Sequence, residues 1–285
     1  MGLSGNGVLL ACIDSGVDYA HPDFCAPDGT SRIAILWDQT IPGNPPMGYA
    51  LGSVYTRQQI NEALASSTPE ERFALVPSRD VTGHGTAVLG IAAGNGRSSA
   101  DAAMRGVAPE ATLVVVKLGN PDPADLPRTS QLLQAVDFCV RYALLVERPL
   151  VTNLSFGNNY GSHSGDSLLE TYLNAVSNLG QNVICIGAGN EGDTGRHYAG
   201  NLKSDRKSSG QTQTVRATSD PAATSAVSAT TDRAVSVEFQ VGAYESSFSL
   251  QIWKVYGDEI SIELISPGGI RSGTLSPVLG TARLT

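Results

Sequence analysis

Apolar and polar positions alternate along the first 200 residues in two ways. Four continuous apolar runs have the length and composition of buried strands: 7–13, 111–118, 150–157 and 182–186. Between them, apolar residues recur at helical spacing in 129–147 and in 166–179, and a shorter helix is predicted near 58–65. Strands alternating with helices predict an α/β fold with a doubly wound parallel sheet. In such sheets functional residues gather at the carboxyl ends of the strands.

The pattern changes after about residue 211. Ser, Thr and Ala dominate to about residue 231, and then apolar residues alternate with polar ones, which is typical of antiparallel strands. The alternating positions are Val235, Val237, Phe239, Val241, Phe248, Leu250, Ile252, Ile260, Ile262 and Leu264. A Ser-Pro-Gly-Gly turn follows. We therefore expect two domains, an α/β domain over 1–208 and a β-sandwich module over 209–285, too short to be a whole sandwich.

Composition excludes several classes of function. The 285 residues carry a formal net charge of -8, with 27 acidic and 19 basic residues and no block of like charges. We therefore expect neither a nucleic-acid partner nor binding to an anionic membrane. No run of about 18 apolar residues predicts a membrane span.

The four cysteines bear on the cellular compartment. Cys12, Cys25, Cys139 and Cys185 form no CxxC pair, and three of them lie in apolar runs, so we expect reduced thiols. Reduced thiols favour a cytoplasmic or otherwise reducing site of synthesis. No signal peptide follows Met1, and because the first strand begins almost at once, we expect that an upstream segment is missing.

Two segments carry residues suited to proton transfer. Asp14 leaves the end of a buried run, where a carboxylate can orient an imidazole. His84 lies between Gly83 and Gly85, and the small apolar residues after it predict a helix packed deep in the protein. Taken alone, Asp14 fits a turn or a helix cap, and His84 fits a structural histidine.

A third segment, 182–192, contains a GxGxxG pattern after a strand, and this raises a dinucleotide-binding alternative. That fingerprint requires a helix after the glycines, but residues 193–202 lack helical spacing. In the other interpretation, the side-chain amide of Asn190 donates a hydrogen bond to a developing oxyanion.

Taken in order, these segments resemble the Asp, His and Asn blocks of the subtilisin-like serine proteases, or subtilases. The resemblance extends through Gly106-Val107-Ala108-Pro109 and covers residues 7 to about 202. It implies that Asp14 orients His84, that His84 is the general base and then the general acid, and that Asn190 stabilises the oxyanion. It also implies that two short segments bind an extended peptide: Ser155, Phe156 and Gly157, and opposite them Gly187, Ala188 and Gly189.

The 70 positions between Asp14 and His84, and the β module after Asn190, resemble the clostridial subtilases that include spore-germination proteases. In that group a jelly-roll module precedes the block Gly-Thr-Ser-Met/Ala that carries the nucleophile. No such block occurs here, so we expect the peptidase domain over 1–208 to be incomplete and the jelly roll over 209–285 to be truncated. The parent protein is then expected to be a serine endopeptidase, and this chain alone inactive. The alternative is a pseudoprotease that binds or signals.

The resemblance also bears on partners and cofactors. It implies an extended peptide or protein substrate, and a propeptide is a further possible partner. No cofactor is required. Calcium sites occur in the family and Asp23 matches a ligand position, but a turn carboxylate is the favoured interpretation. A cytoplasmic or spore-associated location in a bacterium is expected rather than secretion.

Overall fold

The computed structural model describes residues 2–119, 127–157, 160–190, 192, 195, 198–200, 236–242, 244, 250–254 and 260–275. The chain forms two compact units. One comprises Met1–Asn159 with His163–Gln240, and the other comprises Tyr160–Ser162 with Val241–Thr285. The domain boundary predicted at 208/209 lies outside the described residues.

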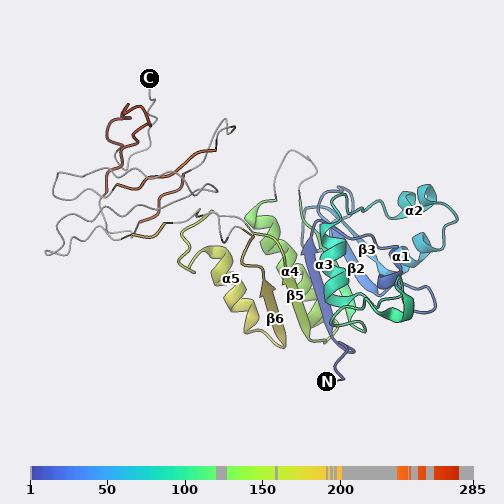
Figure 1. Ribbon diagram of the computed structural model, residues 1–285. Helices are drawn as coiled ribbons and strands as arrows, with labels where there is room; N and C mark the ends of the chain where they lie inside the picture. Colours follow the sequence, from blue (N-terminus) through green and yellow to red (C-terminus); the bar gives the residue numbers. More distant parts are fainter. Residues whose placement is uncertain are drawn as a thin grey trace. The chain divides into compact units, whose positions relative to one another are not determined.

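The first unit is built on a six-stranded sheet with the order β3-β2-β4-β1-β5-β6 (Figure 1). The strands are β1 (Leu9–Asp14), β2 (Ile33–Asp38), β3 (Ser53–Thr56), β4 (Thr112–Lys117), β5 (Leu150–Leu154) and β6 (Asn182–Ile186). All neighbours pair in parallel except β2 and β3, which pair antiparallel at one edge. The predicted α/β fold with a mostly parallel sheet is confirmed. The strands β2 and β3 were not predicted.

Three of the five helices described in this unit begin at Thr or Ser caps. The helices are α1 (Arg57–Leu64), α2 (Pro69–Leu75), α3 (His84–Ala93), α4 (Thr129–Leu145) and α5 (Leu168–Ser177), with short 3-10 turns at Pro22–Phe24 and Ala100–Ala102. Thr56, Thr68 and Ser167 each cap a helix in a capping box. None of the helices in the described part of the chain combines the length and the apolar character that crossing a bilayer requires.

The sheet is covered on both faces by hydrophobic cores. Along β1, Leu9, Ala11 and Ile13 point toward α4 and α5, whereas Leu10 and Cys12 point toward α1 and α3. Such alternation within a continuous apolar run is what a strand buried on both faces requires. β1 has six residues, of which the first five are apolar or Cys. The sixth is Asp14, which therefore lies at the carboxyl edge of the sheet.

Helix α3 is less buried than its sequence predicted. It buries Gly85, Leu89 and Ala93 but leaves Ile91 74% exposed, so the expectation of deep packing is wrong for this chain. The helix is apolar around its whole circumference, a pattern typical of helices covered on all sides. Within the described part of the chain, residues pack against only one side of it.

The same face of the sheet is open beyond α3. In register, Leu10 of β1 pairs with Val151 of β5, and Val151 pairs with Val183 of β6, so these side chains share the α3 face. Leu10 is buried, Val151 is half-buried and Val183 is 55% exposed. Cys185, two residues further on β6, is also exposed. We call Val183 and Cys185 the open apolar face.

In the second unit the described residues include a short antiparallel hairpin. Ile262 bridges Leu275, and Ile265 bridges Arg271. The turn lies at the predicted Ser-Pro-Gly-Gly, where the Gly269 N–H donates to the Ser266 carbonyl at 2.9 Å. Residues 236–242 and 250–254 are described without strand assignment, and the other predicted strand residues lie outside the described part. The jelly roll therefore stays a prediction.

Candidate active site

Asp14 and His84 are in hydrogen-bond contact at the carboxyl edge of the sheet. Asp14 is the last residue of β1 and His84 is the first residue of α3. The distance from Asp14 Oδ1 to His84 Nδ1 is 2.7 Å. Because a carboxylate only accepts, Nδ1 carries the proton and Nε2 of a neutral His84 is left as the acceptor. The Asp14 side chain is 4% exposed and that of His84 is 56% exposed, so the imidazole lies between a buried anion and solvent.

This contact alters the proton affinity of the imidazole. The hydrogen bond that His84 donates to Asp14 and the negative charge of Asp14 raise the pKa of His84 above its ordinary value, and the charge of Asp80 adds to the effect. Partial desolvation of the imidazole lowers its pKa, but by less than these effects raise it. The pair can therefore hold an imidazolium, which is the state a general base reaches after it takes a proton.

The loop that leads to His84 is anchored on strand ends, and sequence analysis did not identify these anchors. Ser78 Oγ donates to Oδ2 of the buried Asp38 at 2.6 Å, at the end of β2. Lys117 Nζ, at the end of β4, donates to the Arg79 carbonyl at 2.6 Å. Asp38 and Lys117 each close an apolar strand, and a charged residue in that position was the available signal. The next residue of the loop, Asp80, contacts both Ser15 and the first turn of α3.

The residues predicted to bind a peptide follow two adjacent strands. Ser155–Gly157 come directly after β5, and Gly187–Gly189 come directly after β6. The Gly187 N–H donates to the Leu154 carbonyl at 3.0 Å, so the two segments leave the sheet side by side. Since β5 also neighbours β1, they lie at the same sheet edge as Asp14. Phe156 packs against the core beneath α4, whereas Gly157 is exposed.

Asn190 lies four residues beyond the end of β6 and is exposed. Asn190 directly follows the Gly187–Gly189 segment in the sequence. The described residues after β6, which are 187–190, 192, 195 and 198–200, contain no helix.

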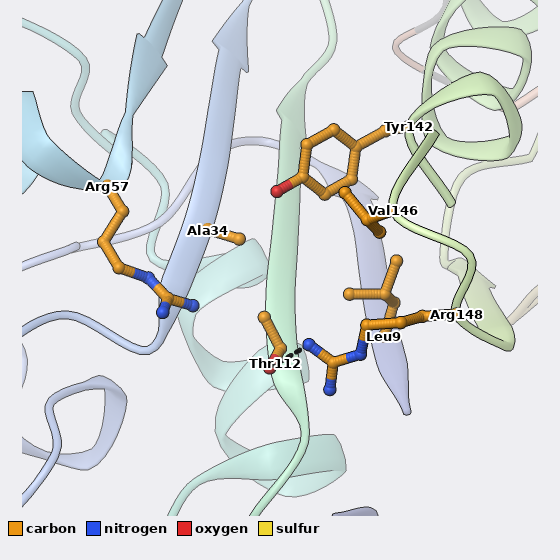
Figure 2. A pocket seen from close by; sticks show the side chains of 7 residues that line it. All are labelled: Leu9, Ala34, Arg57, Thr112, Tyr142, Val146 and Arg148. Carbon is orange, nitrogen blue, oxygen red and sulfur yellow. Dashed lines mark hydrogen bonds between the residues drawn. The ribbon is translucent and has the colours of Figure 1, made fainter. Parts of the chain in front are cut away.

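A surface pocket of about 290 Å³ lies at the other end of the sheet (Figure 2). Leu9 and Thr112, which pair in register at the first residues of β1 and β4, line it together with Tyr142 of α4. Arg148 reaches into this region and donates to Thr112 Oγ1 at 3.0 Å (Figure 2). Because Asp14 and Lys117 end the same two strands, this pocket is separated from the Asp14–His84 pair by the length of the sheet.

The described residues contain no cluster of three or more His, Cys, Asp or Glu arranged to hold a metal ion. Asp23, the residue that matches a calcium position in the resemblance, is buried. Its Oδ1 accepts from the Ser98 N–H at 2.7 Å. All four cysteines are free thiols.

The chain is similar to known proteins over most of its length. The subtilase family model matches residues 5–283. The major intracellular serine protease of Bacillus subtilis (strain 168) is 28% identical over 193 residues, which cover 67% of this chain and 46% of that protein. The minor extracellular protease Vpr of the same organism is 27% identical over 196 residues, which cover 68% of this chain and 19% of that protein.

Among solved structures, the Clostridium perfringens CspB protease superposes with a TM-score of 0.69 at 28% identity. The match covers 97% of this chain and 49% of that one. The chain therefore spans less than half the length of each of these relatives. The resemblance to the clostridial subtilases is confirmed, and the chain belongs to the subtilase family of serine peptidases.

Proposed function

We propose that this chain supplies Asp14, His84 and the peptide-binding edge of a serine endopeptidase, and that the nucleophilic serine is contributed by polypeptide outside residues 1–285. The observation that carries the proposal is the 2.7 Å contact between Asp14 Oδ1 and His84 Nδ1, made at the carboxyl edge of a parallel sheet. Membership of the subtilase family supports it.

In the proposed reaction, His84 Nε2 accepts the proton of the serine hydroxyl as its oxygen attacks the carbonyl carbon of the substrate. The tetrahedral intermediate collapses when the imidazolium gives that proton to the leaving amine, and an acyl-enzyme remains. A water molecule repeats the sequence and regenerates the serine. Asp14 stays ionised throughout and stabilises the imidazolium.

Two further groups complete the proposed site. The side-chain amide of Asn190 donates to the oxyanion, where a neutral donor stabilises developing charge without pairing to it in the ground state. The substrate lies as an extended strand between Ser155–Gly157 and Gly187–Gly189. Backbone pairing on both sides makes affinity depend little on substrate sequence.

The exposure of the open apolar face supports the proposal that a segment outside residues 1–285 supplies the nucleophile. Residues 1–285 contain no Gly-Thr-Ser-Met/Ala block. Val183 and Cys185 are exposed on the face of the sheet that α3 partly covers. A further helix seated on this face would bury these side chains. Without it, the chain would be inactive, since a triad lacking its nucleophile retains only residual catalysis.

The second candidate function is a pseudoprotease that binds peptide without cleaving it. The absence of a serine block from residues 1–285 favours it. The Asp14–His84 contact speaks against it, because peptide binding alone does not require a buried carboxylate paired with an exposed imidazole.

Expression of the complete reading frame tests the proposal. We expect the full-length protein to hydrolyse unstructured protein substrates, and the His84→Ala variant and the chain limited to residues 1–285 to be inactive. Hydrolysis that persists in His84→Ala would contradict the proposal. An extended peptide or protein is the proposed partner. That a propeptide is a further partner, that no cofactor is required and that the location is cytoplasmic or spore-associated remain predictions.

A further inference from the structure

Asp80 joins the two segments that carry Asp14 and His84. Its Oδ1 accepts from Ser15 Oγ at 2.9 Å, from the Gly83 N–H at 3.0 Å and from Thr82 Oγ1 at 3.3 Å. Its Oδ2 accepts from the Thr86 N–H at 2.8 Å and from Thr86 Oγ1 at 2.7 Å. One carboxylate therefore receives five hydrogen bonds from the turn after β1, the glycine turn and the first turn of α3.

Ser15 extends this link to the residue after His84. Its hydroxyl donates to Asp80 and accepts from the Gly85 N–H at 2.9 Å. Ser15 follows Asp14 directly, and Gly85 follows His84 directly. The neighbours of both members of the pair are thus joined by one direct hydrogen bond, and the Ser15 hydroxyl that accepts it donates to Asp80.

Asp80 also replaces the missing cap of α3. Gly83 occupies the N-cap position with a φ of 76° and has no side chain to offer to the helix. The Thr86 N–H is one of the unpaired donors of the first turn, and Asp80 satisfies it from outside the helix. A negatively charged carboxylate at this end also interacts favourably with the helix dipole. The orientation of the turn that carries His84 therefore depends on Asp80.

Asp80 is itself held by the sheet. The two residues before it are bound to Asp38 at the end of β2 and to Lys117 at the end of β4. Asp38 is fully buried, so this anchorage is part of the core. The three residues Ser78, Arg79 and Asp80 are thus tied in turn to the ends of β2, β4 and β1.

We propose that Asp80 is a positioning residue for His84, holding the imidazole at hydrogen-bond distance from Asp14 and in line with the peptide-binding edge. The proposal rests on the proposed function for its catalytic consequence but not for its geometry. The charge of Asp80 acts in the same sense as that of Asp14 and raises the pKa of His84. These two carboxylates are the charged groups that act on the His84 imidazole.

The experiment compares full-length Asp80→Asn with wild type and with a matched control, Asp28→Asn. Asp28 is an exposed carboxylate that accepts from the Thr30 N–H and Thr30 Oγ1, as Asp80 does from Thr86, but it has no contact with α3. We expect Asp80→Asn to lower kcat about 10- to 100-fold with KM nearly unchanged, because misplacement by about 1 Å costs rate rather than binding. Asp28→Asn should leave both constants at wild-type values.

A second readout does not require activity. The sequence contains four histidines, so the His84 ring resonance can be assigned by comparison with His84→Gln. We expect its titration in Asp80→Asn to move to lower pH, with no movement in Asp28→Asn. If the wild-type protein hydrolyses no peptide, the proposed function fails while this titration still tests the position of the imidazole.

Unchanged kcat together with an unchanged His84 titration in Asp80→Asn would overturn the proposal. If Asp80→Asn does not fold, Thr86→Val decides instead. It removes one donor to Asp80 and keeps the carboxylate. A several-fold loss of kcat at an unchanged unfolding temperature supports positioning, and wild-type kcat overturns it.

Discussion

Gly85 and Gly16 are in direct backbone contact beneath the Asp14–His84 pair. A Cβ added at Gly85 would lie 2.2 Å from the Gly16 carbonyl oxygen and 3.1 Å from Asp14 Cβ. No side chain fits there, because backbone atoms cannot yield as a flexible side chain can. The glycine after His84 is therefore required by the close approach of α3 to the end of β1.

Gly85→Ala should separate the two segments and break the Asp14–His84 hydrogen bond. We expect a loss of about 100-fold or more in kcat/KM of the full-length protein, because the base is displaced from its orienting carboxylate. The His84 titration measured by NMR should return toward that of an ordinary histidine. Gly268→Ala is the control, since the nearest atom to its added Cβ is 3.8 Å away. Wild-type activity in Gly85→Ala would show that this contact is not needed.

Asp14→Asn should lower the pKa of His84, because the hydrogen bond and the charge of Asp14 are its largest causes of elevation. The unprotonated imidazole is the active form, so the acid limb of the kcat/KM profile should move to lower pH. The maximum itself should fall about 10⁴-fold, since the wrong tautomer is favoured. An acid limb that stays at the wild-type pH would mean that His84 is not the titrating base.

The same pair affects stability with a defined sign. The folded-state pKa of His84 is raised, so its contribution to stability is complete below the ordinary histidine pKa and is lost as pH rises through the folded value. Thermal unfolding of wild type and His84→Gln should therefore differ more at pH 5.5 than at pH 9. A difference that grows with pH would contradict this. The exposed imidazole keeps the effect small.

Cys185 reports on whether the open apolar face is covered. It is the exposed thiol among the four, whereas burial raises the pKa of Cys12, Cys25 and Cys139 and slows their reaction. In residues 1–285, iodoacetamide should modify Cys185 well before the others. In the full-length protein a segment seated on the face should protect it, as mass spectrometry of tryptic peptides would show. Equal rates for Cys185 in the two proteins would argue against that segment.

Asp137 of α4 ties two other elements to that helix and provides a test away from the site. Its carboxylate accepts from Tyr49 Oη at 2.7 Å, from Tyr172 Oη at 3.0 Å and from Arg141 Nε at 2.7 Å. Partial burial raises the pKa of Asp137, but these three hydrogen bonds together outweigh burial and lower it. The stability it gives is therefore present above the ordinary carboxyl pKa and lost as pH falls through the folded value.

Asp137→Ala should reduce the free energy of unfolding by about 2 kcal/mol at pH 7, because two tyrosine hydroxyls lose their partner. The reduction should shrink in urea unfolding at pH 3. The catalytic constants of the full-length protein should not change, since α4 covers the face of the sheet opposite α3. Glu62→Ala, a surface change on α1, is the control. If Asp137→Ala reduced the free energy of unfolding at pH 3 as much as at pH 7, the ionised carboxylate would not have the role assigned to it.

Local patterns predicted the strands β1, β4, β5 and β6 and the long helix α4. The strand Asn182–Ile186 was predicted with its observed bounds, and α4 begins at the predicted Thr129. A continuous apolar run or a sustained helical period contains enough information for such elements. The strands β2 and β3 were not predicted, although residues 33–37 form a continuous apolar run of the same kind. The pairing of β2 with β4, about 80 residues away, is not encoded by any local pattern.

The candidate site was predicted in part for the same reason. The pairing of Asp14 with His84 followed from the resemblance to a family, and the structure has the two side chains in contact. The role of Asp80 did not follow, although the residue lies in the same motif. Its donors include Ser15, which is 65 positions away in the sequence, and only the fold brings that hydroxyl to the same carboxylate as the donors of residues 82–86.

The central claim is that His84 activates a serine that lies outside residues 1–285. Labelling of the full-length protein with a fluorophosphonate, followed by mass spectrometry of the adduct, tests it most directly. The account predicts one labelled serine beyond residue 285, with labelling abolished in His84→Ala and strongly slowed in Asp14→Asn. Absence of labelling in the folded wild-type protein, or equal labelling in His84→Ala, would contradict it.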